Sequence, residues 1–435
     1  MRVLMAAHPT VGHTQALRAI GRELRDRGHA IAFAVARVPV LPKVFPLPQE
    51  VRVARLIMTN LAADGFRPLP LGAGPGALVR ASRIARSRGS AETLAALDFF
   101  SAGALQDARR LLRAMADGPA DVVVADFSHF GAWLAADALD ISHVAVFHSG
   151  LPFPSPEMSD PAEVLGEPGP QAAARLARGI DLVDRRVAAA RRRLGLDPVA
   201  PGLLMRPYAR GLNVLTTFEE FEPPRPGLAG QGDGPLLWAG PCVGRRSAVR
   251  TGFPWHRFEC GGSGRGDDRP WVYVSLGTVF NEHPEVFREL IGGVHLAGMR
   301  AVVAAGTAAP AVAAMADSGD IVVPFAPQLE LLDRVPVMIS HGGNNSVNEA
   351  LRSGTPLVVV PFGGEQLLNA ARVEYLRVGV RLRLDGLSAA GVAEALGRMV
   401  QPEIQHRARH LAASVPTRDG AEVVADSVEM MLRRP

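Results

Sequence analysis

The chain has 435 residues, of which 48% are hydrophobic and 21% charged, and its formal net charge is +4. This length predicts two domains of roughly 200 residues each, and the apolar content excludes a disordered chain. Basic residues are not interleaved with aromatic ones, so no nucleic-acid-binding surface is indicated. The two cysteines, Cys242 and Cys260, lack partners at metal-ligand spacing and favour a reduced, cytoplasmic protein.

No segment has the pattern of a membrane anchor. The N-terminal apolar run, Val3–Ala7, is too short for a signal peptide. The longest apolar run, Ala301–Met315, contains Pro310 and is too short to cross a bilayer. We therefore expect no integral membrane association.

Strand and helix patterns alternate along the whole chain. In the first half, a helix is expected at Thr14–Arg27, and strands are expected at Arg2–Met5, Ala30–Val35, Val51–Leu56, Asp121–Ala125, His143–Phe147 and Gly211–Thr216. In the second half, strands are expected at Trp271–Ser275, Arg300–Ala304, Ile321–Pro324, Val337–Ser340, Pro356–Val360 and Val380–Leu384. This alternation predicts an α/β protein with parallel sheets covered by helices on both faces.

A stretch rich in Gly, Pro and Arg separates the two halves and includes GGSGRGDDR. A phosphate-binding loop is the alternative interpretation, but no strand-to-helix context supports it. We interpret the stretch as a linker. The predicted parts are then an N-terminal domain at 1–243, a linker at 244–269, a C-terminal domain at 270–413 and a C-terminal helical segment at 414–435.

The segment Met338–Glu374 combines a buried strand, a Gly-Gly turn at 342–343 and a short helix. A helix N-terminus presents unpaired N–H groups and a positive dipole end, which suit an anion. Glu349, one helical turn further on, could accept hydrogen bonds from ribose hydroxyls. Donors to phosphate oxygens are available at His341, Asn345 and Ser346. Because Ser346 and Glu349 also have the spacing of a capping box, helix capping stays an alternative.

The combined pattern resembles the nucleotide-sugar signature of the family 1 glycosyltransferases. The matching residues are His341, Gly343, Asn345, Ser346, Glu349, Ala350, Leu351, Gly354, Pro356, Pro361, Glu365, Gln366, Asn369 and Ala370. The resemblance implies that His341, Asn345 and Ser346 hold the diphosphate of a nucleotide sugar. It implies further that Glu349 holds the ribose and that Glu365 with Gln366 holds the donor sugar. Asn344 replaces the Trp of plant members.

The same resemblance implies the GT-B fold, two doubly wound Rossmann-like domains facing across a cleft, with the last helix crossing back to the first domain. Trp271–Thr278 is similar to the strand and loop that contact the donor phosphates through Ser275, Gly277 and Thr278. Phe325–Gln328 resembles the W-x-P-Q segment. Phe325 would stack on the base and Gln328 would meet the ribose or base, although a plain proline turn is the alternative.

The first loop contains two histidines, and histidine suits a general base near neutral pH. A carboxylate behind the base would fix its tautomer, and Asp126 follows a buried strand. By the resemblance, His13 is the base and Asp126 its orienting partner. Either residue could instead cap a helix. Lesser candidates for the base are His8, His129 and His148.

The expected activity is that of an inverting, metal-independent hexosyltransferase. It would move a sugar from a UDP- or dTDP-sugar to a hydroxyl of a small, hydrophobic natural-product acceptor bound by the loops at 61–101 and 152–170. No Asp-x-Asp pattern occurs, so no metal site and no cofactor beyond the nucleotide-sugar co-substrate is predicted. A monomer or homodimer is expected. The basic segment Leu78–Arg88 is interpreted as a solvated helix face rather than a membrane contact.

Two other activities stay open. A catalytically silent nucleotide-sugar-binding partner would need the second-half motifs alone. A nucleotide-sugar epimerase would share the two-domain plan.

Overall fold

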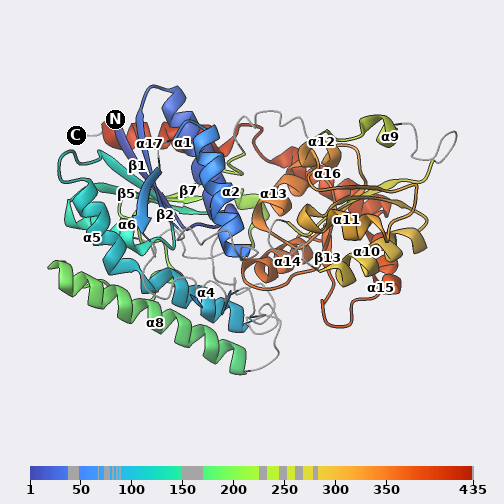
Figure 1. Cartoon of the computed structure of the whole chain (residues 1–435), viewed down its shortest axis with the longest axis horizontal. Helices are drawn as coiled ribbons and strands as arrows, with labels where there is room; N and C mark the ends of the chain where they lie inside the picture. Colours follow the sequence, from blue (N-terminus) through green and yellow to red (C-terminus); the bar gives the residue numbers. More distant parts are fainter. Residues whose placement is uncertain are drawn as a thin grey trace, which may run out of the picture. The chain divides into compact units, whose positions relative to one another are not determined.

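The computed structural model describes residues 1–37, 49–66, 68–72, 79–80, 83–84, 87, 90–148, 170–224, 233–243, 252–259, 268–277 and 283–433. The chain divides into two compact units. Unit 1 comprises Met1–Arg245 and Thr417–Pro435, and unit 2 comprises Arg246–Pro416 (Figure 1). Unit 1 is therefore built from two separate stretches of sequence.

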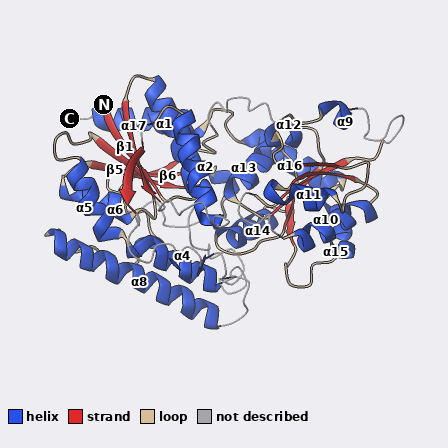
Figure 2. Ribbon diagram, viewed as in Figure 1, coloured by secondary structure: helices blue, strands red, loops and turns tan. Residues whose placement is uncertain are grey.

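Within the described residues, unit 1 contains a seven-stranded parallel sheet in the order β3-β2-β1-β4-β5-β6-β7 (Figure 2). The strands are β1 (Arg2–Ala7), β2 (Ala30–Arg37), β3 (Pro68–Gly72), β4 (Val122–Asp126), β5 (Ser142–Phe147), β6 (Leu212–Leu215) and β7 (Leu236–Trp238). The helices are α1 (Val11–Asp26), α2 (Gln49–Ala63), α4 (Ser90–Ala102), α5 (Ala104–Ala114), α6 (Phe130–Ala138), α8 (Pro170–Leu194) and α17 (Gly420–Arg433), with short 3-10 turns at Leu203–Met205 and Glu219–Phe221.

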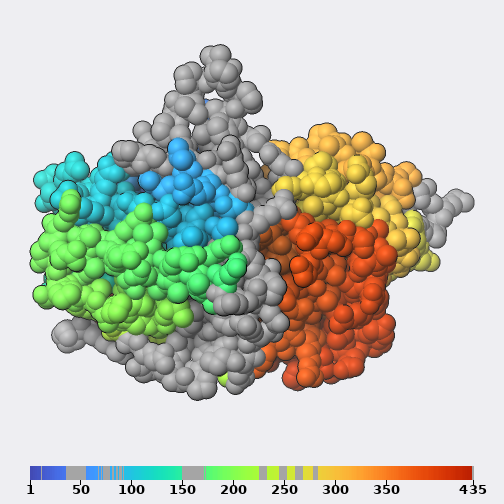
Figure 3. Space-filling model, turned by 90° about the horizontal axis from the view of Figure 1, so that it is seen from below, coloured from blue at the N-terminus to red at the C-terminus, as the bar shows by residue number. Residues whose placement is uncertain are grey.

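Helices cover both faces of this sheet. Alternate residues of a strand point to opposite faces, and both sets are apolar, so each face must be covered. Val3 and Met5 of β1 pack in one cluster with Leu17 of α1. Leu4 packs in a second cluster with Leu111 of α5. The strands are therefore apolar throughout rather than alternating. The long helix α8 packs on α4, and its atoms form part of the surface of unit 1 (green in Figure 3).

The C-terminal helix α17 belongs to unit 1, where it packs against α1. Its apolar side chains belong to the same hydrophobic cluster as Val3, Met5 and Leu17. They are Ala421, Val424, Ala425 and Val428. The close approach of the helix start is fixed by Gly420, whose N–H donates to the carbonyl of Pro241 at 3.0 Å. A Cβ at Gly420 would lie 2.2 Å from the carbonyl oxygen of Gly240.

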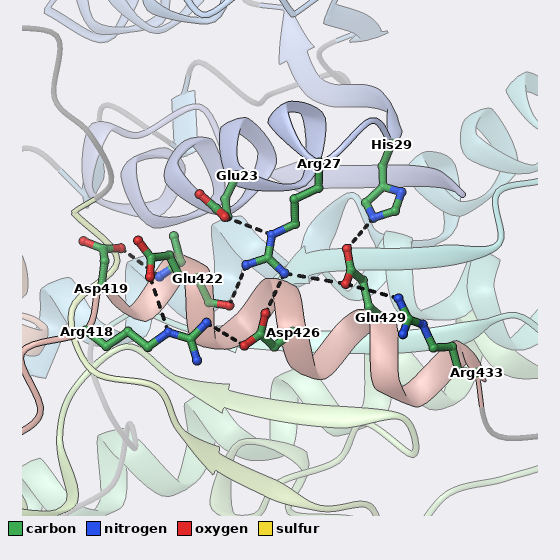
Figure 4. A network of polar contacts seen from close by, with 10 residues as sticks. Glu23, Arg27, His29, Arg418, Asp419, Glu422, Asp426, Glu429 and Arg433 are labelled. Atoms are coloured by element: carbon green, nitrogen blue, oxygen red, sulfur yellow. Dashed lines mark hydrogen bonds and ion pairs between the residues drawn. The ribbon is translucent and has the colours of Figure 1, made fainter.

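Ion pairs join α17 to the end of α1 (Figure 4). Arg27 donates through Nη1 to Oδ1 of Asp426 at 2.6 Å and through Nε to Glu23 at 2.9 Å. His29 Nε2 lies 2.8 Å from a carboxylate oxygen of Glu429. The Arg27–Asp426 and His29–Glu429 contacts link residues 399 and 400 positions apart in sequence.

Unit 2 contains, in its described part, a six-stranded parallel sheet in the order β10-β9-β8-β11-β12-β13. The strands are β8 (Trp271–Ser275), β9 (Arg300–Ala304), β10 (Ile321–Val323), β11 (Val337–Ser340), β12 (Leu357–Val359) and β13 (Gly379–Arg381). The helices are α9 (Trp255–Glu259), α10 (Pro284–Leu296), α11 (Ala309–Ala313), α12 (Gln328–Leu332), α13 (Asn344–Ser353), α14 (Glu365–Tyr375), α15 (Ala389–Met399) and α16 (Pro402–Ser414), with a 3-10 turn at Gly306–Ala308.

The α/β architecture and doubly wound order predicted from the sequence are confirmed. One predicted strand, Val51–Leu56, is wrong, because these residues lie inside α2. The alternating Val51 and Val53 suggested period two, but Ile57 and Leu61, four residues apart, are both buried, as on one face of a helix. The last strand is shifted, from the expected Val380–Leu384 to Gly379–Arg381.

Several predictions fall outside the described residues. They concern Thr278, Cys260, the loop at 152–169, most of Leu78–Arg88 and most of the linker. Among the helices that are described, none is both long and apolar enough to span a bilayer.

Candidate functional site

The candidate base of unit 1 lies where the order of the sheet reverses. From β1 the chain proceeds to β2 on one side, and from β4 it proceeds to β5 on the other. In a doubly wound sheet, ligands bind at this switch point, outside the carboxyl ends of the strands. His8 and His13 follow β1, and Asp126 is the last residue of β4. The fold therefore brings His13 into contact with Asp126, which lies 113 positions further along the sequence.

His13 and Asp126 form a hydrogen-bonded pair. Nδ1 of His13 lies 2.8 Å from Oδ2 of Asp126. The other carboxylate oxygen, Oδ1, accepts from the backbone N–H of Ser128 at 2.8 Å and from the Ser128 hydroxyl. Asp126 is 1% exposed, whereas His13 is partly open to solvent. A buried, fully bonded carboxylate thus orients an accessible imidazole.

Neither residue caps a helix, which removes the structural alternative for both. Thr10 is the residue before α1, and His13 lies third in that helix. The cap of α6 is His129, whose side chain accepts from the N–H of Ala132 at 3.2 Å. Asp126 precedes this cap and bonds to Ser128 instead.

The three lesser histidine candidates surround the pair in different roles. His8 Nε2 lies 3.0 Å from the carbonyl of Ser128, and its ring stacks on His129. His148 Nδ1 lies 3.0 Å from Oδ2 of Asp126, the oxygen that also contacts His13. Phe100 of α4, which sequence reasoning did not single out, lies 5.0 Å from the His13 ring centre and 4.5 Å from that of His8. The phenyl ring of Phe100 therefore lies next to the candidate base.

The electrostatics of this cluster follow from burial and charge. Burial alone would raise the pKa of the Asp126 carboxyl, but attraction to His13 and His148 and their hydrogen bonds outweigh it and hold that pKa well below its usual range. Burial, aided by His129, lowers the pKa of His8 to about 3. Asp126 is therefore ionised and His8 neutral near pH 7.

Unit 2 repeats the arrangement at its own switch point, between β8 and β11. The ring of His341, after β11, lies between two glycines. A Cβ on Gly277 would come within 2.6 Å of that ring, and so would a Cβ on Gly343. Gly277 also has φ of +74°, a conformation that glycine adopts without strain. Burial lowers the pKa of His341 to about 4, so the ring is a neutral donor at physiological pH.

Helix α13 begins directly after these glycines. Its N-cap is Gly343, so Ser346 occupies the third helical position and is not a cap. The capping-box alternative for Ser346 and Glu349 is therefore wrong. Asn345 and Ser346 are half-buried beside the helix start, whereas Glu349 is 2% exposed. The first turn of this helix and these side chains can meet an anion.

Glu349 is held from the neighbouring helix. Nε2 of Gln328 donates to Oε2 of Glu349 at 2.6 Å and lies 3.4 Å from Oγ of Ser346. The Tyr273 hydroxyl donates to Oε1 of Gln328 at 3.2 Å. The structure thus brings the predicted residues Gln328, Ser346 and Glu349 into contact. It also places Tyr273 in this site, a residue that the sequence marked only as an aromatic in a predicted strand.

The remaining predicted donor residues lie around α14 and after β10. Glu365 is the first residue of α14. Gln366 is 3% exposed, and its Oε1 accepts from the N–H of Phe362 at 2.8 Å, so it also fixes the preceding turn. Asn369 donates to the carbonyl of Gly342 at 2.8 Å and accepts from Arg372 at 2.6 Å. Phe325 is 59% exposed, which suits a stacking face.

One group of side chains in the described part of the chain has the spacing of a metal site. The ligand atoms of His13, Asp126 and His148 lie within 4.8 Å of one another. Two imidazoles and one carboxylate suit a transition metal.

Residues 262–411 match the model of the family described as UDP-glucoronosyl and UDP-glucosyl transferase. The NDP-glycosyltransferase YjiC of Bacillus subtilis is 33% identical over 170 residues, which are 39% of this chain and 43% of that relative. The match to YjiC thus spans less than half of its length. The 4'-demethylrebeccamycin synthase of Lentzea aerocolonigenes is 29% identical over 456 residues, which cover 98% of this chain and 99% of that relative.

Over these lengths the chain is similar to glycosyltransferases. The resemblance read from its motifs is confirmed. The solved glycotransferase of kitacinnamycin superposes on this chain with a TM-score of 0.71 at 19% identity, covering 99% of each chain. The calicheamicin glycosyltransferase CalG4 gives 0.67 at 23% identity, covering 100% of this chain and 98% of its own. The chain therefore has the two Rossmann-like domains of the GT-B fold.

Proposed function

We propose that the protein transfers a sugar from a nucleoside diphosphate sugar to a hydroxyl group of a small-molecule acceptor. The observation that carries this proposal is the arrangement in unit 2. A neutral His341 lies between two glycines at the start of α13, and a buried Glu349 is held by Gln328. These residues lie within residues 262–411, the segment that matches the family model, and their pattern resembles the nucleotide-sugar signature of that family.

The donor would be held entirely by unit 2. The first turn of α13 with Asn345 and Ser346, the His341 ring and the β8 loop with Ser275 and Gly277 would bind the diphosphate. Glu349 would accept hydrogen bonds from the ribose hydroxyls, Gln328 would donate to a ribose oxygen, and Phe325 would stack on the base. Glu365 and Gln366 would contact the sugar. Preorganised donors of this kind each contribute about 3 kcal/mol when charge develops on the leaving diphosphate.

The acceptor proton would be taken by His13. Its Nδ1 is bonded to Asp126, which leaves Nε2 as the base. The acceptor oxygen would attack the anomeric carbon as the diphosphate leaves, through an oxocarbenium-like transition state and with inversion. Asp126 would stabilise the imidazolium that forms without taking the proton.

The acceptor class is proposed from two observations. The rings of Phe100, His8 and His148 lie beside that of His13, with centres 5.0, 6.0 and 3.8 Å away, which suits an apolar acceptor. Relatives include a 4'-demethylrebeccamycin synthase and an oleandomycin glycosyltransferase. A hydrophobic natural product is therefore proposed. A solved neighbour, VinC, was obtained with dTDP, so both UDP and dTDP are donors to test.

The first experiment measures thermal stabilisation by UDP, dTDP and NAD, because a ligand bound to the native state raises its melting temperature. UDP or dTDP should stabilise wild type and His13→Ala alike, and NAD should stabilise neither. Turnover is then measured with the stabilising nucleotide's glucose conjugate and a panel of phenols and macrolides. His13→Ala should lower kcat by a factor of about 100 to 10,000. Absence of stabilisation by either diphosphate would overturn the donor site.

Metal independence is proposed for the same reaction, because the diphosphate charge would be met by protein donors. Activity after treatment with EDTA and gel filtration should equal that of the untreated enzyme. A loss restored by Mg²⁺ or Mn²⁺ would contradict this. An epimerised nucleotide sugar formed without acceptor would favour the epimerase alternative, and donor binding without any turnover would favour the silent partner.

A further inference from the structure

Three side chains at the switch point of unit 1 place metal-binding atoms around one point. Nδ1 of His13 lies 2.8 Å from Oδ2 of Asp126, and Nδ1 of His148 lies 3.0 Å from the same oxygen. The three atoms all lie within 4.8 Å of one another. They come from the start of α1, the end of β4 and the residue after β5, so the sheet and its first helix hold them together.

We propose that this group binds one Zn²⁺ ion and that the bound ion inhibits sugar transfer. The ligands would be Nδ1 of His13, Nδ1 of His148 and Oδ2 of Asp126. Binding is argued from the geometry of these three side chains. Inhibition rests on the proposed function, in which Nε2 of His13 takes the acceptor proton. An inhibitory ion is compatible with metal-independent transfer, because its removal leaves the enzyme active.

The spacing of the three atoms suits Zn²⁺ after small rotations of the side chains. Zn²⁺ binds imidazole nitrogen and carboxylate oxygen at about 2.0–2.2 Å, so neighbouring ligand atoms of a tetrahedral site lie about 3.4 Å apart. Each His–Asp distance must therefore lengthen by about 0.5 Å to admit the ion. Mg²⁺ and Ca²⁺ fit less well, because they prefer oxygen ligands and this group has two imidazoles.

The carboxylate of Asp126 is fixed through its other oxygen. Ser128 donates to Oδ1 from its backbone N–H at 2.8 Å and also from its hydroxyl. Carboxylates that bind metals are typically hydrogen-bonded in this way, and such partners orient the ligand oxygen. The carboxylate is also buried, and a buried charge is stabilised when it is paired or coordinates a metal.

The two neighbouring histidines have ring nitrogens engaged elsewhere. Nε2 of His8 lies 3.0 Å from the carbonyl of Ser128, and Nδ1 of His129 accepts the N–H of Ala132. The described part of the chain therefore offers three ligands, which leaves a fourth tetrahedral position for water. The side chain of His13 is 14% exposed and is the most open of the three, so it gives the ion access from solvent.

Binding through Nδ1 would disable His13 as a base. In the proposed mechanism Nδ1 faces Asp126, and the lone pair on Nε2 accepts the acceptor proton. A ring nitrogen that coordinates a metal must supply its own lone pair. Nδ1 would therefore lose its proton to water while Nε2 gains one, with no net change in the number of protons. The neutral ring could then donate from Nε2 but could not accept.

Binding is measured by isothermal titration of metal-free protein with ZnCl₂. Wild type should bind one ion per chain at this site with a Kd of about 1 µM, weaker than that of four-ligand structural sites. His148→Phe keeps an aromatic ring but removes a ligand, and His13→Ala removes another. Each should raise the Kd about 100-fold, because loss of an outer hydrogen bond alone costs about 10–100-fold. Ser128→Ala, which removes one such bond, should raise it about tenfold.

Two control variants remove histidines outside the group. His406 and His410 are exposed on α16 with ring centres 6.4 Å apart, an arrangement that can bind a metal at the surface. His143 is buried on β5. His406→Gln and His143→Gln should both bind Zn²⁺ as wild type does. Binding that is lost in His406→Gln and kept in His148→Phe would assign the ion to the surface pair and overturn the site.

Cu²⁺ identifies the ligands by electron paramagnetic resonance, because nitrogen ligands bind it more tightly than Zn²⁺. The spectrum should show coupling to two imidazole nitrogens in wild type and to one in His148→Phe. The same coupling in both proteins would overturn the assignment. If His148→Phe does not fold, as judged by its thermal melt, the comparison is made with His13→Ala, whose side chain is partly open to solvent.

Inhibition is measured with saturating nucleotide sugar and free Zn²⁺ set by a metal buffer. At about ten times the wild-type Kd, turnover of wild type should fall about tenfold by mass action and return on addition of EDTA. His148→Phe should lose only about a tenth of its own rate under the same conditions. Full turnover of wild type with the site loaded would overturn the inhibition. Failure of the proposed function would instead appear as a wild type that binds Zn²⁺ but has no turnover even without metal.

Discussion

Gln328 and Glu349 are joined across two helices of unit 2. Nε2 of Gln328, at the start of α12, donates to Oε2 of Glu349, in the middle of α13, at 2.6 Å. Tyr273 of β8 supports Gln328 in turn. Glu349 is therefore preorganised before any ligand binds. A buried carboxylate that lost this donor would be left partly unsatisfied, at a cost of about 1–3 kcal/mol.

Gln328→Leu should weaken the binding of UDP or dTDP and lower the melting temperature. We expect a dissociation constant raised about tenfold, equivalent to about 1.4 kcal/mol, by isothermal titration calorimetry. Tyr273→Phe, which removes only the support, should have a smaller effect of the same sign. Equal affinity in wild type and Gln328→Leu would show that this pair does not contribute to the nucleotide site.

Gly343→Ala should disturb the diphosphate site. The added Cβ would lie 2.6 Å from Nε2 of His341, closer than real contacts allow, so the ring must move. We expect at least tenfold weaker nucleotide binding. Gly397→Ala is the control, because its Cβ would meet nothing within 4 Å inside α15 and should stabilise the protein by about 0.5–1 kcal/mol. Unchanged nucleotide affinity in Gly343→Ala would contradict the close packing of His341.

Arg27→Met should loosen the attachment of α17 without affecting nucleotide affinity. The ion pairs are partly exposed, so the expected loss is about 1 kcal/mol, diminished by salt. Hydrogen bonds from Arg27 and Arg418 lower the pKa of Asp426, so its contribution is present above its usual value of 3.8 and is lost as pH falls below it. The difference in melting temperature between wild type and variant should therefore shrink below about pH 4. A difference that is independent of both pH and salt would assign the effect to packing.

His143 should make the fold sensitive to acid. Burial, with a smaller contribution from His129, lowers its pKa from 6.5 to about 3. The unfolded chain binds this proton first, so stability is fully present above pH 6.5 and falls as pH drops toward 3. Between pH 6.5 and 5 the loss is about 2 kcal/mol. His143→Gln should lose that much less stability over this interval in urea unfolding, and identical slopes in the two proteins would refute the assignment.

Most strands of both sheets could be predicted from the sequence because a parallel strand buried on two faces is a short, uninterrupted apolar run. The exception is β3, whose sequence PLPLG was not recognised as a strand. WVYVS, RAVVA and VMIS are such runs, and the structure gives them the predicted bounds. Val51–Leu56 failed because its first residues alternate like a half-buried strand. Its helical period becomes visible only with Ile57 and Leu61.

The sequence motifs identified the pair His13 and Asp126, yet they could not choose between chemistry and helix capping. The capping alternative depends on which residue precedes each helix. In the structure these residues are Thr10, three positions before His13, and His129, three positions after Asp126. His148 was harder to find, because its contact with Asp126 comes from the pairing of β4 with β5 and from no local pattern. Arg372 gave no signal beyond its charge.

The placement of α17 has a consequence for biosynthesis. The cluster beneath the first sheet contains Val424 and Val428, which leave the ribosome after all of unit 2. The part of the protein that is translated first therefore stays incomplete until the end, while unit 2, made in one continuous stretch, has all of its residues earlier. During synthesis of unit 2, the apolar face of unit 1 that α17 covers in the folded protein is therefore exposed. A chaperone that protects unit 1 would act during this interval.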